Sequence, residues 1–202
     1  FAAMSNENGF PIIREVCIYF EYQLLRGNRA YKRSSNEFDA FSSPNFPALA
    51  TSGVKVQLSS DLLWYCEGPI RYQKTISRNV GVITLYPGLN FDILPALPEW
   101  KVLLIRTFGA GNAPKSQSFL RFLKRLEKNG TIIVNTSQCV SGSVVPGLYD
   151  SSSALEQVNM LSAKDMTFES ALVKSMVLLG QGLNEADFRV KFMIPLAGEL
   201  TE

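Results

Sequence analysis

The chain has 202 residues, of which 46% are hydrophobic, and its 20 basic and 18 acidic residues leave a net charge of +2. This length allows one large or two small domains, and the balanced charge argues against nucleic acid and anionic lipid as partners. The sequence contains no histidine, which excludes Ser-His-Asp and Cys-His catalysis and removes the commonest metal ligand.

The cysteines and the apolar runs indicate the compartment. Cys17, Cys66 and Cys139 lie far apart, in neither a zinc-site spacing nor a disulfide framework. We therefore expect no metal and a reducing, cytoplasmic location. No apolar run approaches the roughly 20 residues of a membrane span, so we expect no membrane association. The first residues, Phe-Ala-Ala-Met, are not a signal peptide, and we expect the chain to be a fragment that begins within a helix.

The first elements are predicted to be strands. Residues 16–20 are β-branched and aromatic, which is typical of a buried strand, and residues 23–25 are the expected hairpin return. Arg26 and Arg29 flank a Gly-Asn pair that predicts a turn. These arginines could bind an anion, or lie in a solvated turn and pair with nearby carboxylates; we favour the second interpretation.

A long loop and a domain boundary are expected next. Residues 34–53 are rich in Ser, Asn and Pro, and we expect a structured loop pinned by Phe38, Phe41, Phe46 and Leu49. Residues 54–58 alternate between apolar and polar, which predicts a half-buried strand. Residues 59–79 show no clear period and are the best candidate for a linker.

From residue 80 the pattern alternates between strand and helix. Residues 80–85 are predicted to be a strand, followed by a short helical turn at 91–97. Apolar runs at 102–105 and 132–134 flank a helical segment with one apolar face, formed by Phe119, Phe122, Leu123 and Leu126. This order predicts one right-handed parallel strand–helix–strand unit.

Helix boundaries follow from capping residues. We expect Pro114 in the first turn of the helix at 119–126 and Gly130 as its left-handed cap. A short helix is predicted at 154–158. Two longer helices follow. The first is predicted to be capped by Asp165 and ended by Gly180, with one apolar face formed by Phe168, Leu172, Met176 and Leu179. The second is predicted to be capped by Asn184 and to carry Phe188 and Phe192.

Polar side chains follow both strands of the parallel unit. Arg106 ends the first strand, Asn112 lies in the loop after it, and Ser137 and Cys139 follow the second strand. Ligands of open parallel sheets bind outside the carboxyl ends of the strands, so we expect these residues at one crevice. Arg106 suits a carboxylate, although a structural ion pair is the alternative. The set could bind a small amide or amino acid, but it supplies no general base.

The glycines of this loop raise a second possibility, nucleotide binding. Gly109 and Gly111 follow a strand and precede a helix, but Pro114 stands where the dinucleotide fingerprint needs a third glycine. We therefore expect no nucleotide cofactor, and expect the glycines to permit a tight turn and a close backbone approach. Cys139 lacks a histidine to activate it and is expected to pack or to contact a ligand.

Six segments together resemble the cytoplasmic (type I) L-asparaginases, in family order and over nearly the whole chain. They are EVCIYFEYQLLRGNRA at 15–30, FDAFSSPNFPALA at 38–50, ITLYPG at 83–88, RTFGAGNAP at 106–114, VNTSQCVSGSVVPGLY at 134–149 and DMTFESALVKSMVLLG at 165–180. The resemblance implies an α/β fold in which residues 1–66 end an N-terminal α/β domain. Residues 67–79 would be the linker, and residues 80–202 a smaller C-terminal domain with a parallel sheet flanked by helices.

The resemblance also implies an activity. The full-length protein would hydrolyse L-asparagine to L-aspartate and ammonia with a threonine nucleophile, without a cofactor, as a homodimer or homotetramer. The family's TGGTI-like and Thr-Asp motifs are not in this chain, so we expect no catalytic residue here and an inactive fragment. Alternatives are a non-catalytic asparagine-binding fragment or homologue, and a lysophospholipase-type relative carrying ankyrin repeats.

Four site residues are implied by the family motifs. Asn112 matches the asparagine that reaches the active site of a neighbouring subunit. Arg106, Ser137 and Cys139 match residues of an allosteric asparagine site. Ala30 stands where the family has a threonine, and the lost hydrogen bond, of about 0.5–1.5 kcal/mol, predicts weaker effector binding.

Overall fold

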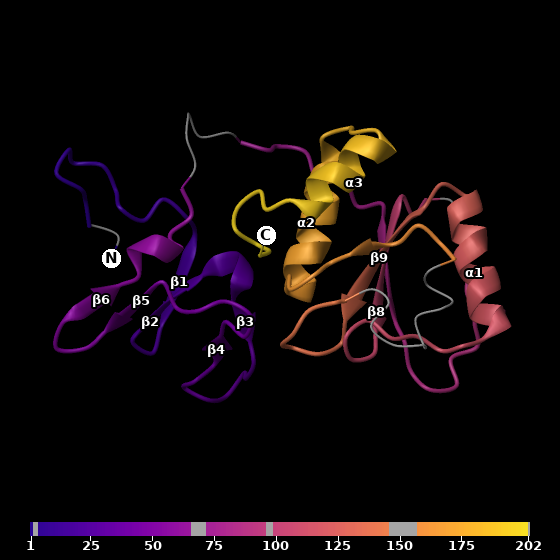
Figure 1. The fold of residues 1–202 in the computed structure, drawn as a ribbon, viewed down its shortest axis with the longest axis horizontal. Helices are drawn as coiled ribbons and strands as arrows, with labels where there is room; N and C mark the ends of the chain where they lie inside the picture. The colour runs from indigo at the N-terminus through magenta and orange to yellow at the C-terminus, as the bar shows by residue number, and fades with distance from the viewer. Residues whose placement is uncertain (2–3, 66–71, 96–98, 146–156, 202) are drawn as a thin grey trace. The chain divides into compact units, whose positions relative to one another are not determined.

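A computed structural model describes residues 1, 4–65, 72–95, 99–145 and 157–201 of the chain (Figure 1). The chain divides into two compact units. Unit 1 comprises Phe1–Arg71 and Leu196–Glu199, and unit 2 comprises Tyr72–Pro195 and Leu200–Glu202. None of the described helices is long and apolar enough to cross a membrane.

Unit 1 is built on a four-stranded antiparallel sheet. Its strand order is β1 (Cys17–Phe20), β2 (Gln23–Arg26), β5 (Ala50–Ser52) and β6 (Val56–Leu58), and β3 (Tyr31–Lys32) pairs separately with β4 (Phe41–Ser42). The predicted hairpin return is confirmed, since Phe20 pairs with Gln23. Glu21 and Tyr22 between them have φ of 44° and 64°, as tight hairpins require. The unit also has two 3-10 turns, Gly27–Arg29 and Ser60–Leu62.

Several burial predictions in unit 1 are wrong. Val16 is 85% exposed and Tyr19 is 51% exposed, so residues 16–20 are not a fully buried strand. Phe38 and Val54 are also exposed, whereas Leu49 is completely buried with Leu24. Tyr19 lies in β1, which is an outer strand of this sheet, and Val16, Phe38 and Val54 lie outside the strands, in connecting segments that run over the surface. The two- and three-residue strands β3, β4 and β5 are too short to show a period in the sequence.

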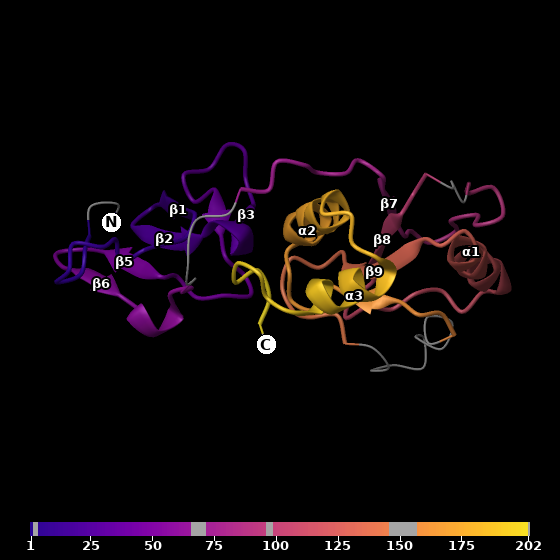
Figure 2. The same cartoon turned by 90° about the horizontal axis from the view of Figure 1, so that it is seen from above.

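Unit 2 is a parallel sheet between helices. The strand order is β10 (Leu161–Ser162), β9 (Ile132–Ser137), β8 (Val102–Thr107) and β7 (Val80–Thr84), with every pair parallel. Helix α1 (Gln117–Lys128) covers one face, and α2 (Phe168–Gly180) and α3 (Glu185–Met193) cover the other (Figures 1 and 2). This arrangement confirms the predicted parallel strand–helix–strand unit.

Alternation along β8 assigns each side chain to one face of the sheet. Leu103 and Ile105 belong to the core beneath α1, whereas Val102 and Leu104 belong to the core beneath α2 and α3. All four are 0% exposed, because a parallel sheet with helices on both faces buries successive residues of its central strands.

The buried face of α1 is as predicted, but its start is not. Phe119, Phe122, Leu123 and Leu126 are at most 1% exposed. The helix begins after Ser116, whose Oγ accepts a hydrogen bond from the Phe119 N–H at 3.1 Å. Pro114 therefore precedes the cap and is not in the first turn. Gly130 has φ of 72° and ends the helix as expected.

Helix α2 departs from prediction at its cap and on its buried face. Thr167 is the N-cap, and its side chain accepts from the Ser170 N–H, while Asp165 instead accepts from the Thr201 N–H. The predicted apolar face is only partly buried. The buried residues of this helix are Ala171, Lys174, Ser175 and Leu178. The helix is apolar on more than one side, so its period does not select the face that packs.

Helix α3 is confirmed, and the shorter helices are not. Asn184 accepts from the Asp187 N–H, and the rings of Phe188 and Phe192 lie 5.9 Å apart in the core. Residues 91–94 form turns and not a helix, and residues 96–98 lie outside the described residues. The predicted helix at 154–158 falls largely outside them too, as does Cys66.

Candidate functional site

The predicted site residues lie at the carboxyl ends of β8 and β9. Arg106 pairs with Thr136, and Thr107 pairs with Ser137, which is the last residue of β9. Because neighbouring residues of a strand point to opposite faces, Arg106 lies on the α2 face and Ser137 on the α1 face. The sheet therefore does not bring these two side chains to the same face.

The Arg106 side chain stacks on an aromatic ring and has a buried donor without a partner among the described residues. Its guanidinium lies over the ring of Phe168 in α2, with 4.5 Å from the Cζ atom to the ring centre. The Nε atom is buried and has no hydrogen-bond partner in the described part of the chain. Within those residues Arg106 makes no ion pair either, so its alternative role as a structural ion pair is not seen. A guanidinium of this kind is suited to receive a carboxylate.

Ser137 connects Cys139 with the loop that carries Asn112. The Ser137 Oγ donates to the Gly109 carbonyl at 2.6 Å and accepts from the Cys139 N–H at 2.8 Å. Asn112 forms a bridge with Phe108, with N–O distances of 2.7 and 2.9 Å, which closes the loop. These contacts bring Ser137, Cys139 and the loop together, apart from Arg106.

Gly111 explains the Gly-rich sequence of this loop. Its φ is 111°, and a Cβ at this position would lie 2.9 Å from Val144 Cγ1 and 3.1 Å from Asn135 Nδ2. The expected close backbone approach is confirmed, because only glycine leaves room for both neighbours. The loop is shaped by packing against β9 and the segment that follows it.

The cysteines offer no activated nucleophile in the described residues. Burial, followed by the Glu15 carboxylate, raises the pKa of Cys17 to about 11. The Cys17 thiol is therefore protonated at neutral pH and unreactive. Cys139 is exposed. The described residues also contain no group of three His, Cys, Asp or Glu side chains close enough to hold a metal ion.

Arg26 and Arg29 are buried and not solvated. They are 3% and 1% exposed. Arg26 forms an ion pair with Glu15, which confirms the expected carboxylate partner, and Arg29 Nε donates to the Gly198 carbonyl at 2.8 Å. The two arginines hold the Leu196–Glu199 segment within unit 1. Ala30 follows this turn and is half-buried in the same unit.

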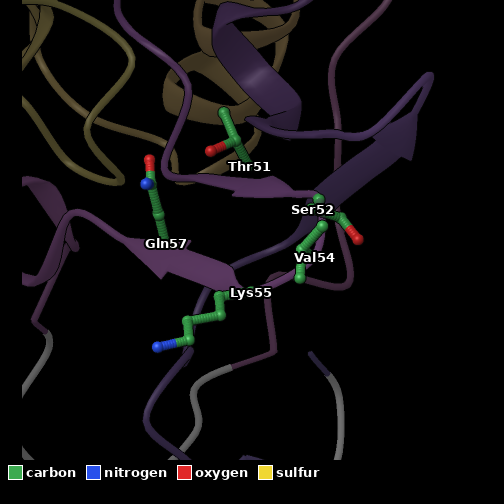
Figure 3. Close-up of a pocket in the computed structure, with 6 residues that line it drawn as sticks. Thr51, Ser52, Val54, Lys55 and Gln57 are labelled. Carbon is green, nitrogen blue, oxygen red and sulfur yellow. The ribbon is translucent and has the colours of Figure 1, made fainter.

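An open hollow of about 400 Å³ lies at the β5–β6 hairpin and was not predicted (Figure 3). It is lined by Thr51, Ser52, Gly53, Val54, Lys55 and Gln57. Thr51 and Gln57 pair across the strands, and Lys55 extends away from them (Figure 3). Val54 is fully exposed, so the hollow is a surface feature of a hairpin.

The comparisons with known proteins cover both units. Residues 79–192 match the glutaminase/asparaginase C-terminal domain model, and residues 2–63 match the N-terminal asparaginase model. The chain belongs to the glutaminase/asparaginase family. L-asparaginase 1 of Escherichia coli K12 is 36% identical over 192 residues, which are 94% of this chain and 57% of that protein. A 60 kDa lysophospholipase of Mus musculus is 36% identical over 198 residues, 96% of this chain and 35% of that protein.

A solved relative confirms the fold. The crystal structure of L-asparaginase I from Vibrio cholerae is 36% identical and superposes with a TM-score of 0.83, over 94% of this chain and 58% of that one. The resemblance to type I asparaginases and the asparaginase-like fold are therefore confirmed. The chain spans a little over half the length of these two asparaginases.

Proposed function

We propose that the full-length protein hydrolyses L-asparagine to L-aspartate and ammonia. The observation that carries this proposal is that both asparaginase family models match in order, with 36% identity to L-asparaginase 1 over 94% of the chain. In this proposal the threonine nucleophile lies outside the chain, no cofactor takes part, and the protein is a cytoplasmic homo-oligomer, a dimer or a tetramer.

The domain assignment is part of the same proposal. Residues 1–66 would be the C-terminal part of the N-terminal domain, residues 67–79 the linker, and residues 80–202 the C-terminal domain. The two family-model matches, which end at residue 63 and begin at residue 79, support a boundary between them.

The function is tested by comparing the full-length protein with residues 1–202 alone. We expect ammonia release from L-asparagine by the full-length protein and none by the 202-residue chain, because the nucleophile lies outside it. The measurement is coupled ammonia detection at saturating L-asparagine. Turnover by the chain alone would contradict this placement of the nucleophile, and an inactive full-length protein would contradict the proposed activity.

A second candidate function comes from the relative named as a 60 kDa lysophospholipase. The same two preparations should be assayed with lysophosphatidylcholine. Fatty-acid release by the full-length protein, without ammonia release from L-asparagine, would favour this candidate.

We also propose that Arg106, Ser137 and Cys139 bind L-asparagine as an effector, and that Asn112 contacts substrate in a neighbouring subunit. The buried Nε of Arg106, which has no hydrogen-bond partner in the part of the chain that the structure describes, supports a carboxylate at this residue. The hydrogen bonds that join Ser137 to Cys139 and to Gly109 support a link between the two sites. Because Arg106 lies on the other face of the sheet, the effector would have to reach both faces at the strand ends.

The effector proposal predicts sigmoidal kinetics that depend on Arg106. Arg106→Lys keeps the charge but loses the planar fork and its stacking on Phe168, so the half-saturating L-asparagine concentration for activation should rise about 10-fold. Cys139→Ala should shift it in the same direction. Initial rates of the full-length variants over a range of L-asparagine concentrations measure both changes. Hyperbolic kinetics in the unmodified protein, unchanged by Cys139→Ala, would contradict an effector site.

A further inference from the structure

The loop between β8 and α1 is held through three successive carbonyl groups. The Gly109 carbonyl accepts from Ser137 Oγ at 2.6 Å, the Ala110 carbonyl from the Val145 N–H at 3.0 Å, and the Gly111 carbonyl from Asn135 Nδ2 at 3.2 Å. Every donor lies in β9 or in the segment that follows it. Loop carbonyls normally face water, so three consecutive intramolecular bonds indicate a loop held in one conformation.

Asn135 is the buried member of this set. It is 7% exposed and directly follows the three apolar residues that begin β9. The Thr107 hydroxyl, which is 0% exposed, lies 2.7 Å from Asn135 Oδ1 and 3.0 Å from the Thr136 carbonyl oxygen, and the shorter of these two hydrogen bonds is the one to Asn135. Because a carbonyl can only accept, the amide must present Nδ2 to Gly111, and the Thr107 hydroxyl stabilises this orientation. Asn135 therefore has a specific partner on each side of its amide group.

Asn135 contacts Gly111, the residue that directly precedes Asn112, the proposed substrate contact. Gly111 packs so closely against Asn135 and Val144 that no side chain fits there, and Asn112 is the next residue. The Asn112 main chain pairs with Phe108 at the other end of the loop. The bridge to Phe108 and the three held carbonyls before it thus help to fix the main chain of Asn112.

We propose that Asn135, oriented by Thr107, is a positioning residue that holds the Gly109–Asn112 loop in the conformation in which Asn112 contacts substrate. The inference rests on the role proposed above for Asn112. In this proposal Asn135 itself touches neither substrate nor any reacting atom. Its effect on turnover passes through the loop, and a misplacement of about 1 Å at a substrate-positioning residue can lower the rate by up to about 100-fold.

The test uses full-length protein carrying Thr107→Val or Asn135→Ala. Thr107→Val preserves the shape of the side chain but removes the hydroxyl, and we expect kcat/KM for L-asparagine to fall about 10-fold. Asn135→Ala should lower it by about 10- to 100-fold. In an Asn112→Ala background neither change should lower kcat/KM further, because the residue through which they act is absent.

Thr136→Val is the matched control. It also removes a buried hydroxyl, which donates to the Ile105 carbonyl at 3.2 Å. The Thr136 side chain lies on the face of the sheet opposite to Thr107 and Asn135. We expect this change to lower stability but to leave kcat/KM within about two-fold. Losses from Thr107→Val that are equal in the wild-type and Asn112→Ala backgrounds would overturn the proposal.

Hydrogen exchange separates this proposal from the proposed function. Thr107→Val should speed amide exchange at residues 109–112 by about 10-fold, and Thr136→Val should not. If the full-length wild-type protein is inactive, the proposed function fails, and exchange still decides whether Thr107 and Asn135 hold the loop. Unchanged exchange in folded Thr107→Val protein would overturn the positioning role, with or without activity. If Asn135→Ala does not fold, Thr107→Val alone carries the test.

Discussion

Replacing Glu15 with alanine is expected to destabilise unit 1 by about 3–5 kcal/mol. Glu15 and Arg26 form an ion pair whose side chains are only 6% and 4% exposed. The carboxylate also accepts from the Trp64 N–H at 2.8 Å. Its removal leaves a buried guanidinium without its countercharge, and this uncompensated charge, more than the lost attraction, is the source of the cost.

The rest of the Arg26 environment cannot replace the carboxylate. Arg26 Nη2 donates to the Leu62 carbonyl at 2.7 Å, and the guanidinium lies 4.4 Å from the centre of the Phe46 ring. These contacts satisfy hydrogen bonds and supply a favourable ring face, but neither carries a formal negative charge. The measurement is the free energy of unfolding of the full-length protein by urea titration, followed by tryptophan fluorescence.

Asp39→Ala is the matched control for Glu15→Ala. Asp39 pairs with Arg33 in the same unit, but the two side chains are 54% and 47% exposed. Solvent screens this pair, and its loss should cost less than about 1 kcal/mol. Glu15→Gln should lie between the two, because it keeps the volume and an acceptor for Trp64. Equal losses from Glu15→Ala and Asp39→Ala would show that burial does not set the cost.

Gly180→Ala is expected to destabilise unit 2 by about 3 kcal/mol, although alanine normally favours a helix. A Cβ on Gly180 would lie 2.1 Å from the Thr75 carbonyl oxygen and 2.9 Å from Ile76 Cα. Both are main-chain atoms, so no side-chain rotation relieves the overlap. The Ser77 N–H also donates to the Met176 carbonyl at 3.0 Å, and this bond would break as the segment moves away from α2.

Gly182→Ala is the control that distinguishes steric overlap of an added Cβ from the strain of a positive φ. Gly182 has φ of 68°, and a Cβ added to it would meet no atom of the described residues within 4 Å, so alanine there should cost only about 1 kcal/mol. Thermal unfolding of the full-length variants, with hydrogen exchange at Ser77, measures both effects. A Gly180→Ala protein more stable than wild type would contradict the close approach and would indicate that helix propensity decides.

The sequence alone was sufficient where the apolar residues of a segment define a single buried face. Four apolar residues at helical spacing predicted the buried face of α1, and all four are buried. Asn184, followed by Phe188 and Phe192, predicted α3 in the same way. The motif order predicted the family and its fold, and both are confirmed. In each case the determining information lies within a few residues or in a quoted motif.

The tertiary structure decided what depends on residues far apart in the chain. Helix α2 is apolar on several sides, so its packing against the sheet and against Thr75 selected the buried face, and Gly180 proved to be a packing position. Strand alternation separated Arg106 from Ser137, although both end neighbouring strands. The sequence by itself determined the longer strands and helices and the family of this protein. The faces of those elements and the partners of their polar groups were decided only by the folded chain, because burial and hydrogen bonding between distant residues have no local period.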